Sequence, residues 1–226
     1  MLKNRLFVFV ASMVMLNVSL AVAQNPIRID SGTRADTRIT IAVPPFVATQ
    51  PEFTQAAAEM AQVVADDLAF SGLFILLPPA QYPAGFTGME ADAQNLNLSA
   101  WRATKAENLV YGIVFQEGSQ LVVQFRLFDL YSNTQLYGQE VRVDREYYRL
   151  ASHRFSEEVL RYTDGVPGIG TTEILFAGTS GSNQKEIYVA DYDGANMRPI
   201  TKHQSLSIMP EVSSDGNSIS YLSYKD

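Results

Sequence analysis

The chain has 226 residues, of which 46% are apolar and 11% aromatic, with 17 basic residues, 24 acidic residues and no cysteine. The apolar content suffices for a buried core in one or two domains, and the lack of cysteine excludes disulfides, thiolate metal sites and cysteine nucleophiles. The net charge of -7 and the lack of a basic run argue against a nucleic-acid partner, because phosphate binding needs clustered Lys and Arg.

Residues 1–23 have the layout of a cleavable secretory signal. Lys3 and Arg5 precede an apolar run over 6–20, and the small-residue site Ala21-Val22-Ala23 follows. An apolar run of about 15 residues is short for a bilayer core of about 30 Å. The pattern therefore predicts cleavage after Ala23 and an exported, soluble protein without a membrane span. Without Lys3 and Arg5, 15 basic residues face 24 acidic residues, a net charge of -9.

In residues 24–36 only Ile27 and Ile29 are large and apolar, and they alternate with polar residues. One interpretation is an edge strand or a loose terminus. The other is a recognition arm that adds a strand to the sheet of a partner.

Residues 37–163 predict an α/β domain, a small mixed sheet with helices in the order β-α-β-α-β-β-β-α. The strands are expected at 38–43, 73–77, 109–115, 120–129 and 134–143, and the helices at 51–70, 99–107 and 144–164. The last three strands are joined by the turns Glu117-Gly118 and Ser132-Asn133, so we expect antiparallel hairpins.

Helical spacing of apolar residues predicts which faces of the helices are buried. The first helix carries Phe53, Ala57, Met60, Val64 and Leu68, and stops at Ser71-Gly72. The last carries Tyr148, Ala151, Phe155, Val159 and Tyr162, and stops at Asp164-Gly165. Ser99 and Asp144 are the expected caps of the second and last helices. Trp101, the single tryptophan, is expected to fill the core.

Residues 164–172 are rich in Gly and Pro and predict a linker, after which 173–226 predict part of a β-propeller. The segments Asp191-Tyr192-Asp193-Gly194 and Ser213-Ser214-Asp215-Gly216 are turn signals between alternating β-type runs. Ile174 and Ile219 begin two similar runs 45 residues apart, the length of one propeller blade. The fold expected is thus an α/β domain followed by an incomplete all-β propeller, with one blade and the start of a second.

Residues suited to catalysis or metal binding do not converge in the sequence. His153 is expected on the solvent face of the last helix and His203 in a propeller loop, without a second His or Cys at ligand spacing. Asp191 and Asp193 fit a turn better than a calcium loop. Asp66-Asp67 point about 100° apart on a helix, and no Gly-x-Ser-x-Gly elbow, phosphate loop or dinucleotide fingerprint is present. We expect no enzyme, no cofactor and no metal site.

Residues 210–221, preceded by 187–194, resemble the propeller repeat of the TolB family, periplasmic proteins of the Tol-Pal envelope system. The chain departs from that repeat at Val212, where Trp is usual, and at Ser214, where Pro is usual. The order of signal, small α/β domain and propeller extends the resemblance over most of the chain.

The resemblance implies a non-enzymatic periplasmic scaffold that supports envelope integrity, cell division and import of some macromolecules. It implies that a TolA-like inner-membrane protein contacts the N-terminal arm, and that a Pal-like outer-membrane lipoprotein binds the propeller, largely on later blades. The arm residues expected to bind are Ile27, Arg28, Ile29, Asp30, Ser31 and Gly32.

Two alternatives belong to other classes. One is the front of a secreted peptidase whose propeller precedes a hydrolase domain, although the α/β domain here stands on the wrong side of the propeller for it. The other is a propeller that binds glycans or small molecules, with which Tyr188, Tyr192 and Tyr221 are compatible.

Overall fold

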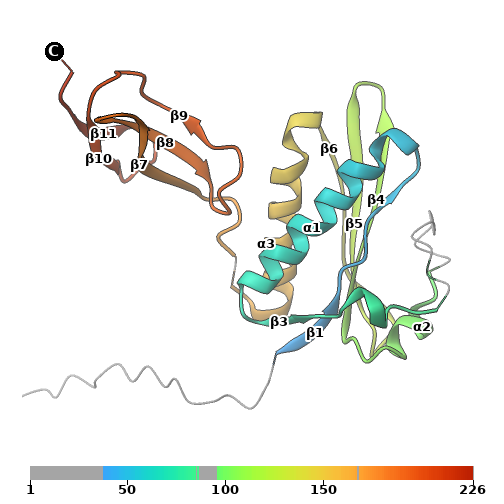
Figure 1. The fold of residues 1–226 in the computed structure, drawn as a ribbon. Coiled ribbons are helices and arrows are strands. Elements are labelled where there is room, and N and C mark those ends of the chain that lie inside the picture. The colour runs from blue at the N-terminus through green and yellow to red at the C-terminus, as the bar shows by residue number, and fades with distance from the viewer. Residues whose placement is uncertain (1–37, 85, 87–95, 167, 226) are drawn as a thin grey trace, which may run out of the picture. The chain divides into compact units, whose positions relative to one another are not determined.

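The computed structural model describes residues 38–84, 86, 96–166 and 168–225. The expected signal over 1–23 and the expected arm over 24–36 lie outside these ranges, so cleavage after Ala23 and the role of the arm stay predictions. The described chain comprises an α/β part followed by an all-β part (Figure 1). The predicted fold class, an α/β domain followed by an incomplete propeller, is thereby confirmed.

The α/β part is built on a six-stranded sheet in the order β3-β1-β4-β5-β6, with β2 also paired to β4. The strands are β1 (Ile39–Ala42), β2 (Val47–Ala48), β3 (Phe74–Leu76), β4 (Asn108–Glu117), β5 (Gln120–Asp129) and β6 (Thr134–Val143). β1 is parallel to β3 and β4, whereas β4, β5 and β6 are antiparallel neighbours, as the hairpin signals predict. Gly118 and Asn133 adopt φ of +62° and +56° in the two hairpin turns.

Two long helices, α1 (Thr54–Phe70) and α3 (Tyr148–Asp164), pack on each other and lie on one face of this sheet (Figure 1). The short 3-10 helices η1 (Pro51–Phe53) and η4 (Arg145–Tyr147) lead into them. Gly72 and Gly165, with φ of +71° and +76°, end them where the sequence predicts. Asp144 stands at the N-terminus of η4 but makes no capping hydrogen bond with its side chain, so its predicted capping role is wrong.

The first core fills the space between the sheet and these helices. Phe125 of β5 stacks on Phe155 of α3 with ring centroids 4.5 Å apart. The predicted apolar face of α1 is buried at all five positions. On α3 one prediction is wrong: Tyr162 is 54% exposed, because it lies in the last turn and covers the ring of Tyr137 from outside.

A second core lies on the opposite face, where the segment after β3 covers β4 and β5. It contains Trp101 of α2 (Leu98–Arg102), which is 2% exposed, as expected of a core residue. The 3-10 helix η2 (Pro79–Gln81), earlier in the chain, is exposed. Helix α2 is shorter than predicted and is capped by Asn97, whose Oδ1 accepts from the N–H of Ala100 at 3.1 Å, not by Ser99. It cannot reach residue 107, because Lys105 adopts a left-handed φ of +69°.

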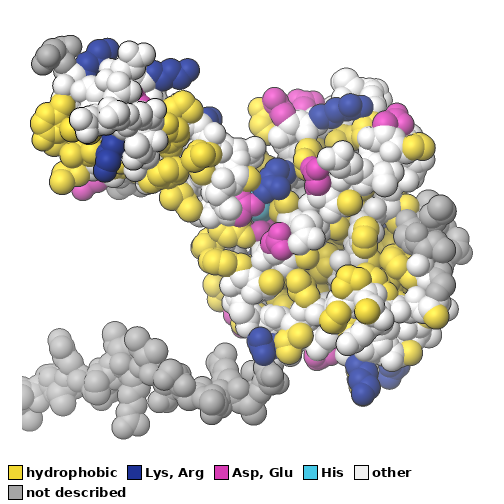
Figure 2. All heavy atoms as spheres, viewed as in Figure 1, with side chains coloured by type: hydrophobic (Ala, Val, Ile, Leu, Met, Phe, Trp, Pro, Cys, Tyr) yellow, Lys and Arg dark blue, Asp and Glu magenta, His cyan; other side chains and the backbone are white. Residues whose placement is uncertain are grey.

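The all-β part has a three-stranded antiparallel sheet and a hairpin. The sheet contains β7 (Glu173–Gly181), β8 (Gln184–Asp191) and β9 (Arg198–Pro199), and the hairpin contains β10 (Ser207–Val212) and β11 (Ile219–Ser223). Ile187 and Ala190 are buried, whereas Ile174, Met209 and Val212 are exposed. Figure 2 shows apolar side chains gathered on the surface of this part.

None of the helices within the described ranges combines the length and the apolar character that a membrane crossing demands.

Candidate functional site

A group of polar side chains joins α1 and α3 to the turn that follows β8. We call it the junction cluster, and its members are Asp67 from α1, Arg149 and His153 from α3, and Asp191, Tyr192 and Asp193 at the end of β8 and in the turn. Each element supplies its residues for a local reason: both helices are amphipathic, and the Asp-x-Asp-Gly segment forms a tight turn.

His153 lies at the centre of the cluster and is 1% exposed. Its Nδ1 lies 2.9 Å from Oδ2 and 3.1 Å from Oδ1 of Asp67, so with an ionised carboxylate Nδ1 is the protonated ring nitrogen. The expectation that His153 faces solvent is wrong. The buried surface of α3 is wider than the stripe that contacts the sheet, because α3 also packs against α1 and meets the turn after β8.

Tyr192 connects the turn after β8 to α1. Its hydroxyl donates a hydrogen bond to Oδ1 of Asp67, and its ring meets the ring of His153 edge-on at 5.4 Å. Burial raises the pKa of the Tyr192 hydroxyl, and the hydrogen bond to the Asp67 carboxylate raises it further. Tyr192 is therefore a neutral donor to Asp67, whose carboxylate receives hydrogen bonds from both His153 and Tyr192.

The turn itself presents two carboxylates beside His153. The N–H of Gly194 donates to the carbonyl of Asp191 at 2.8 Å, and the N–H of Ala195 donates to Oδ1 of Asp193 at 2.9 Å. The predicted turn is thus confirmed. Oδ2 of Asp193 forms an ion pair with Arg149 and lies 3.8 Å from Nε2 of His153.

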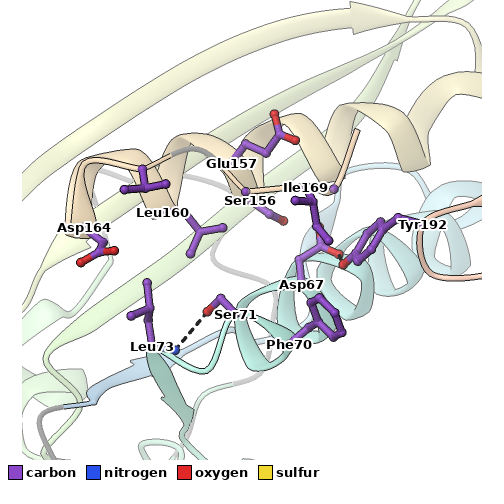
Figure 3. A pocket seen from close by; sticks show the side chains of 13 residues that line it. Asp67, Phe70, Ser71, Leu73, Ser156, Glu157, Leu160, Asp164, Ile169 and Tyr192 are labelled. Atoms are coloured by element: carbon purple, nitrogen blue, oxygen red, sulfur yellow. Dashed lines mark hydrogen bonds between the residues drawn. The ribbon is translucent and has the colours of Figure 1, made fainter. Parts of the chain in front are cut away.

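A pocket of about 280 Å³ adjoins the cluster between the C-terminal turns of α1 and α3 (Figure 3). Asp67 and Tyr192 form part of its wall, and Phe70, Leu160 and Ile169 supply apolar surface. At its rim the N–H of Leu73 donates to Oγ of Ser71 at 3.2 Å (Figure 3). A second hollow of about 630 Å³ is lined by His153, Asp191 and Asn196, among others.

The junction cluster joins α1, α3 and the turn after β8 through hydrogen bonds and an ion pair. The hydroxyl of Tyr192 is committed to Asp67 instead of His153, and the nearby Ser152 and Ser156 donate to backbone carbonyls of their own helix. Nε2 of His153 has no hydrogen-bond partner among the described residues. A nucleophile–base pair requires a hydroxyl or thiol within hydrogen-bond reach of the base, which this nitrogen lacks in the described ranges.

The residues predicted to bind a partner, Ile27 to Gly32, lie outside the described residues.

The sequence does not predict the junction cluster, because each member taken alone fits an ordinary position on a helix or in a turn. Asp67 is buried while Asp66 is exposed and accepts from Gln62, so the prediction that these two do not converge is right. Ser152 and Ser156, four residues apart on α3, were the available signal: small residues at helical spacing indicate a second packing face.

Comparisons with known proteins match both parts of the chain. Residues 26–136 match the family model described as the TolB amino-terminal domain. The Tol-Pal system protein TolB of Dinoroseobacter shibae is 33% identical over 204 residues, which cover 88% of this chain and 45% of that protein. TolB of Desulfosudis oleivorans is 35% identical over 196 residues, which cover 83% of this chain and 43% of that protein.

A solved structure matches the fold. The crystal structure of TolB from Acinetobacter baumannii superimposes with a TM-score of 0.67 at 20% identity, over 84% of this chain and 45% of that one. The chain spans about half the length of the curated relatives it matches. Residues 26–136 of this chain are therefore a TolB amino-terminal domain, and the chain as a whole is similar in sequence to TolB proteins.

Proposed function

We propose that this protein is a non-enzymatic periplasmic scaffold of the Tol-Pal system, which links an inner-membrane TolA-like protein to an outer-membrane Pal-like lipoprotein. In this role it supports envelope integrity, cell division and the import of some macromolecules. The observation that carries the proposal is the match to proteins named as Tol-Pal system components, which extends over 88% of the chain. The export signal expected over 1–23 supports a periplasmic location.

The proposed division of labour follows the order of the parts. After a signal over 1–23, residues 24–36 form the partner-binding arm, 37–163 the α/β domain, 164–172 the linker, and 173–226 the first blade with the start of the second. The junction cluster ties the α/β part to the turn after β8, which suits a protein that must transmit force or occupancy between two partners. A change at one end alters affinity at the other only if the two states differ in contacts there.

The arm is proposed to bind the TolA-like partner by strand addition. Main-chain hydrogen bonds supply affinity in such a complex, and alternate side chains supply specificity. Ile27 and Ile29 alternate in this way, and Arg28, Asp30, Ser31 and Gly32 complete the segment. We propose no individual residues for the Pal-like partner.

Deletion of residues 24–33 tests this directly. We expect the deletion to abolish binding of the TolA-like partner in isothermal titration calorimetry while the circular dichroism spectrum stays unchanged. Ile29→Pro removes one backbone donor and is expected to weaken binding, whereas Arg34→Ala, outside the segment, is the matched control. Unchanged TolA binding by the deletion variant would count against the arm.

The non-enzymatic character has its own test. We expect no turnover of peptides, esters or glycosides by the purified protein. Turnover that a single substitution within this chain abolishes would contradict the scaffold and favour the peptidase alternative.

A further inference from the structure

The buried His153 has one ring nitrogen without a hydrogen-bond partner among the described residues. Nδ1 is held by Asp67, whereas Nε2 makes no hydrogen bond to any described residue, although the side chain is 2% exposed. A buried polar atom without a partner is costly and calls for a physical explanation. Nε2 is aimed at the turn after β8, where Asp191 and Asp193 stand.

These three side chains have the geometry of a ligand set. One ligand atom each from His153, Asp191 and Asp193 lies within 4.8 Å of the other two. Atoms bound to one ion at about 2.0 to 2.2 Å are separated by no more than about 4.4 Å, so small side-chain movements bring all three into a first coordination shell. Asp191 ends β8 and Asp193 lies in the tight turn, so the backbone holds both carboxylates close to the helix.

The residues behind His153 also match a metal site. Histidines that bind metals donate their other ring N–H to a carboxylate or carbonyl, which sets the tautomer and the ring orientation. Here Asp67 accepts from Nδ1 at 2.9 Å, and Tyr192 donates to Asp67 in turn. This arrangement presents a lone pair on Nε2 toward Asp193.

The charge of the junction cluster favours a dication. Asp67, Asp191 and Asp193 contribute three negative charges in their ionised forms, and Arg149, paired with Asp193, contributes one positive charge. The guanidinium of Arg149 is the cation that pairs with Asp193 in this structure. A metal ion that binds Asp193 must therefore displace this guanidinium. The hollow lined by Arg149, His153 and Asp191 offers a route of entry and room for the displaced side chain.

We propose that His153, Asp191 and Asp193 bind a divalent first-row transition-metal ion such as Zn²⁺, with Asp67 as the carboxylate that orients the histidine. The mixed nitrogen and oxygen donors select the ion, because imidazole suits Zn²⁺, Ni²⁺ or Cu²⁺, whereas Ca²⁺ and Mg²⁺ prefer oxygen ligands alone. The bound ion joins α3 to the end of β8.

The sequence makes this site unusually easy to test, because the chain contains two histidines and no cysteine. The chain is purified without a histidine tag and labelled with ¹⁵N-histidine. Addition of Zn²⁺ is expected to shift Nε2 of His153 at one equivalent while the signals of His203 stay in place. Zinc-dependent stabilisation in thermal unfolding is the second readout, and Ca²⁺ at the same concentration is expected to give neither effect.

Variants separate the site from incidental zinc binding. His153→Gln and Asp193→Asn are expected to abolish the stabilisation, and Asp67→Asn to weaken Zn²⁺ binding by about 10- to 100-fold. Arg149→Met removes the competing cation and is expected to tighten binding. His203→Gln is the matched control and is expected to bind as the unaltered chain does.

Asp193→Asn keeps the test decisive if His153→Gln fails to fold, since Asp193 lies at the surface of the cluster. Zinc shifts confined to His203, equal stabilisation of Asp193→Asn, or equal effects of Ca²⁺ and Zn²⁺ would each overturn the proposal. Loss of TolA binding would not, because the arm is a separate segment.

Discussion

At the scale of single residues, Asp215 organises the turn between β10 and β11. Its carboxylate accepts from the hydroxyl of Ser213 at 2.5 Å and from the backbone and side-chain nitrogens of Asn217, each at 3.1 Å. These hydrogen bonds lower the pKa of Asp215 from 3.8 to about 2, and the hydrogen bond from Ser213 has the largest effect. The sequence Asp215-Gly216 predicts a turn, and in the structure the ionised carboxylate of Asp215 stabilises that turn.

A pH dependence follows from this lowered pKa. A carboxyl group with a lower pKa in the folded state stabilises the fold above its unfolded pKa, 3.8, and loses that contribution as the pH falls toward about 2. We expect a carboxyl ¹³C titration of Asp215 with a midpoint near 2. Ser213→Ala removes the main donor and is expected to raise that midpoint; an unchanged midpoint would show that Ser213 is not the cause.

At the scale of elements, Gly112 leaves room on β4 for the ring of Phe46, the residue that precedes β2. A Cβ at Gly112 would lie 2.4 Å from Cγ of Phe46, whose ring covers the strand and meets Phe125 edge-on at 5.8 Å. A side chain at this position and the Phe46 ring cannot both occupy the same space. The sequence pattern of β4 predicts a strand, but it does not indicate that one position must remain bare.

Gly112→Ala is therefore expected to lower the free energy of unfolding by about 1 to 3 kcal/mol, measured by urea denaturation. In the background of Phe46→Leu, which removes the ring, the same substitution is expected to cost less. The double-mutant cycle isolates this coupling, since residues in contact are not additive. Additive losses would mean that the strain arises elsewhere.

At the scale of the whole molecule, Tyr192 and Asp67 connect parts of the chain that lie 125 residues apart. The carboxylate of Asp67 is buried, so each donor to it compensates the cost of removing a charge from water. The ring of Tyr192 also contacts Phe70 at 5.7 Å. The hydroxyl is thus one of several polar contacts in the junction cluster, together with the ion pair between Arg149 and Asp193.

Tyr192→Phe is expected to lower the free energy of unfolding by about 1 to 3 kcal/mol, because it leaves a buried carboxylate with one donor fewer. Tyr188→Phe is the matched control, since Tyr188 packs on Phe176 through its ring. Denaturation followed by circular dichroism measures both. Equal losses in the two variants would show that the hydroxyl of Tyr192 does not join the parts.

The sequence by itself determined the local features of this protein. The sequence predicted strands at 120–129 and 134–143, the observed bounds of β5 and β6, and Gly72, Gly118 and Gly165 marked turns and helix ends. These features depend on the side-chain period of a strand and on the φ that glycine tolerates, both of which are properties of neighbouring residues.

Only the tertiary structure brings the residues of the junction cluster together. Asp67 and His153 are 86 residues apart, and the helical period placed His153 toward solvent because it describes one packing face only. Burial of His153 arises from a second contact, with α1 and with the turn after β8. A residue's surroundings depend on every element that packs against it, and the period of its own helix cannot contain that information.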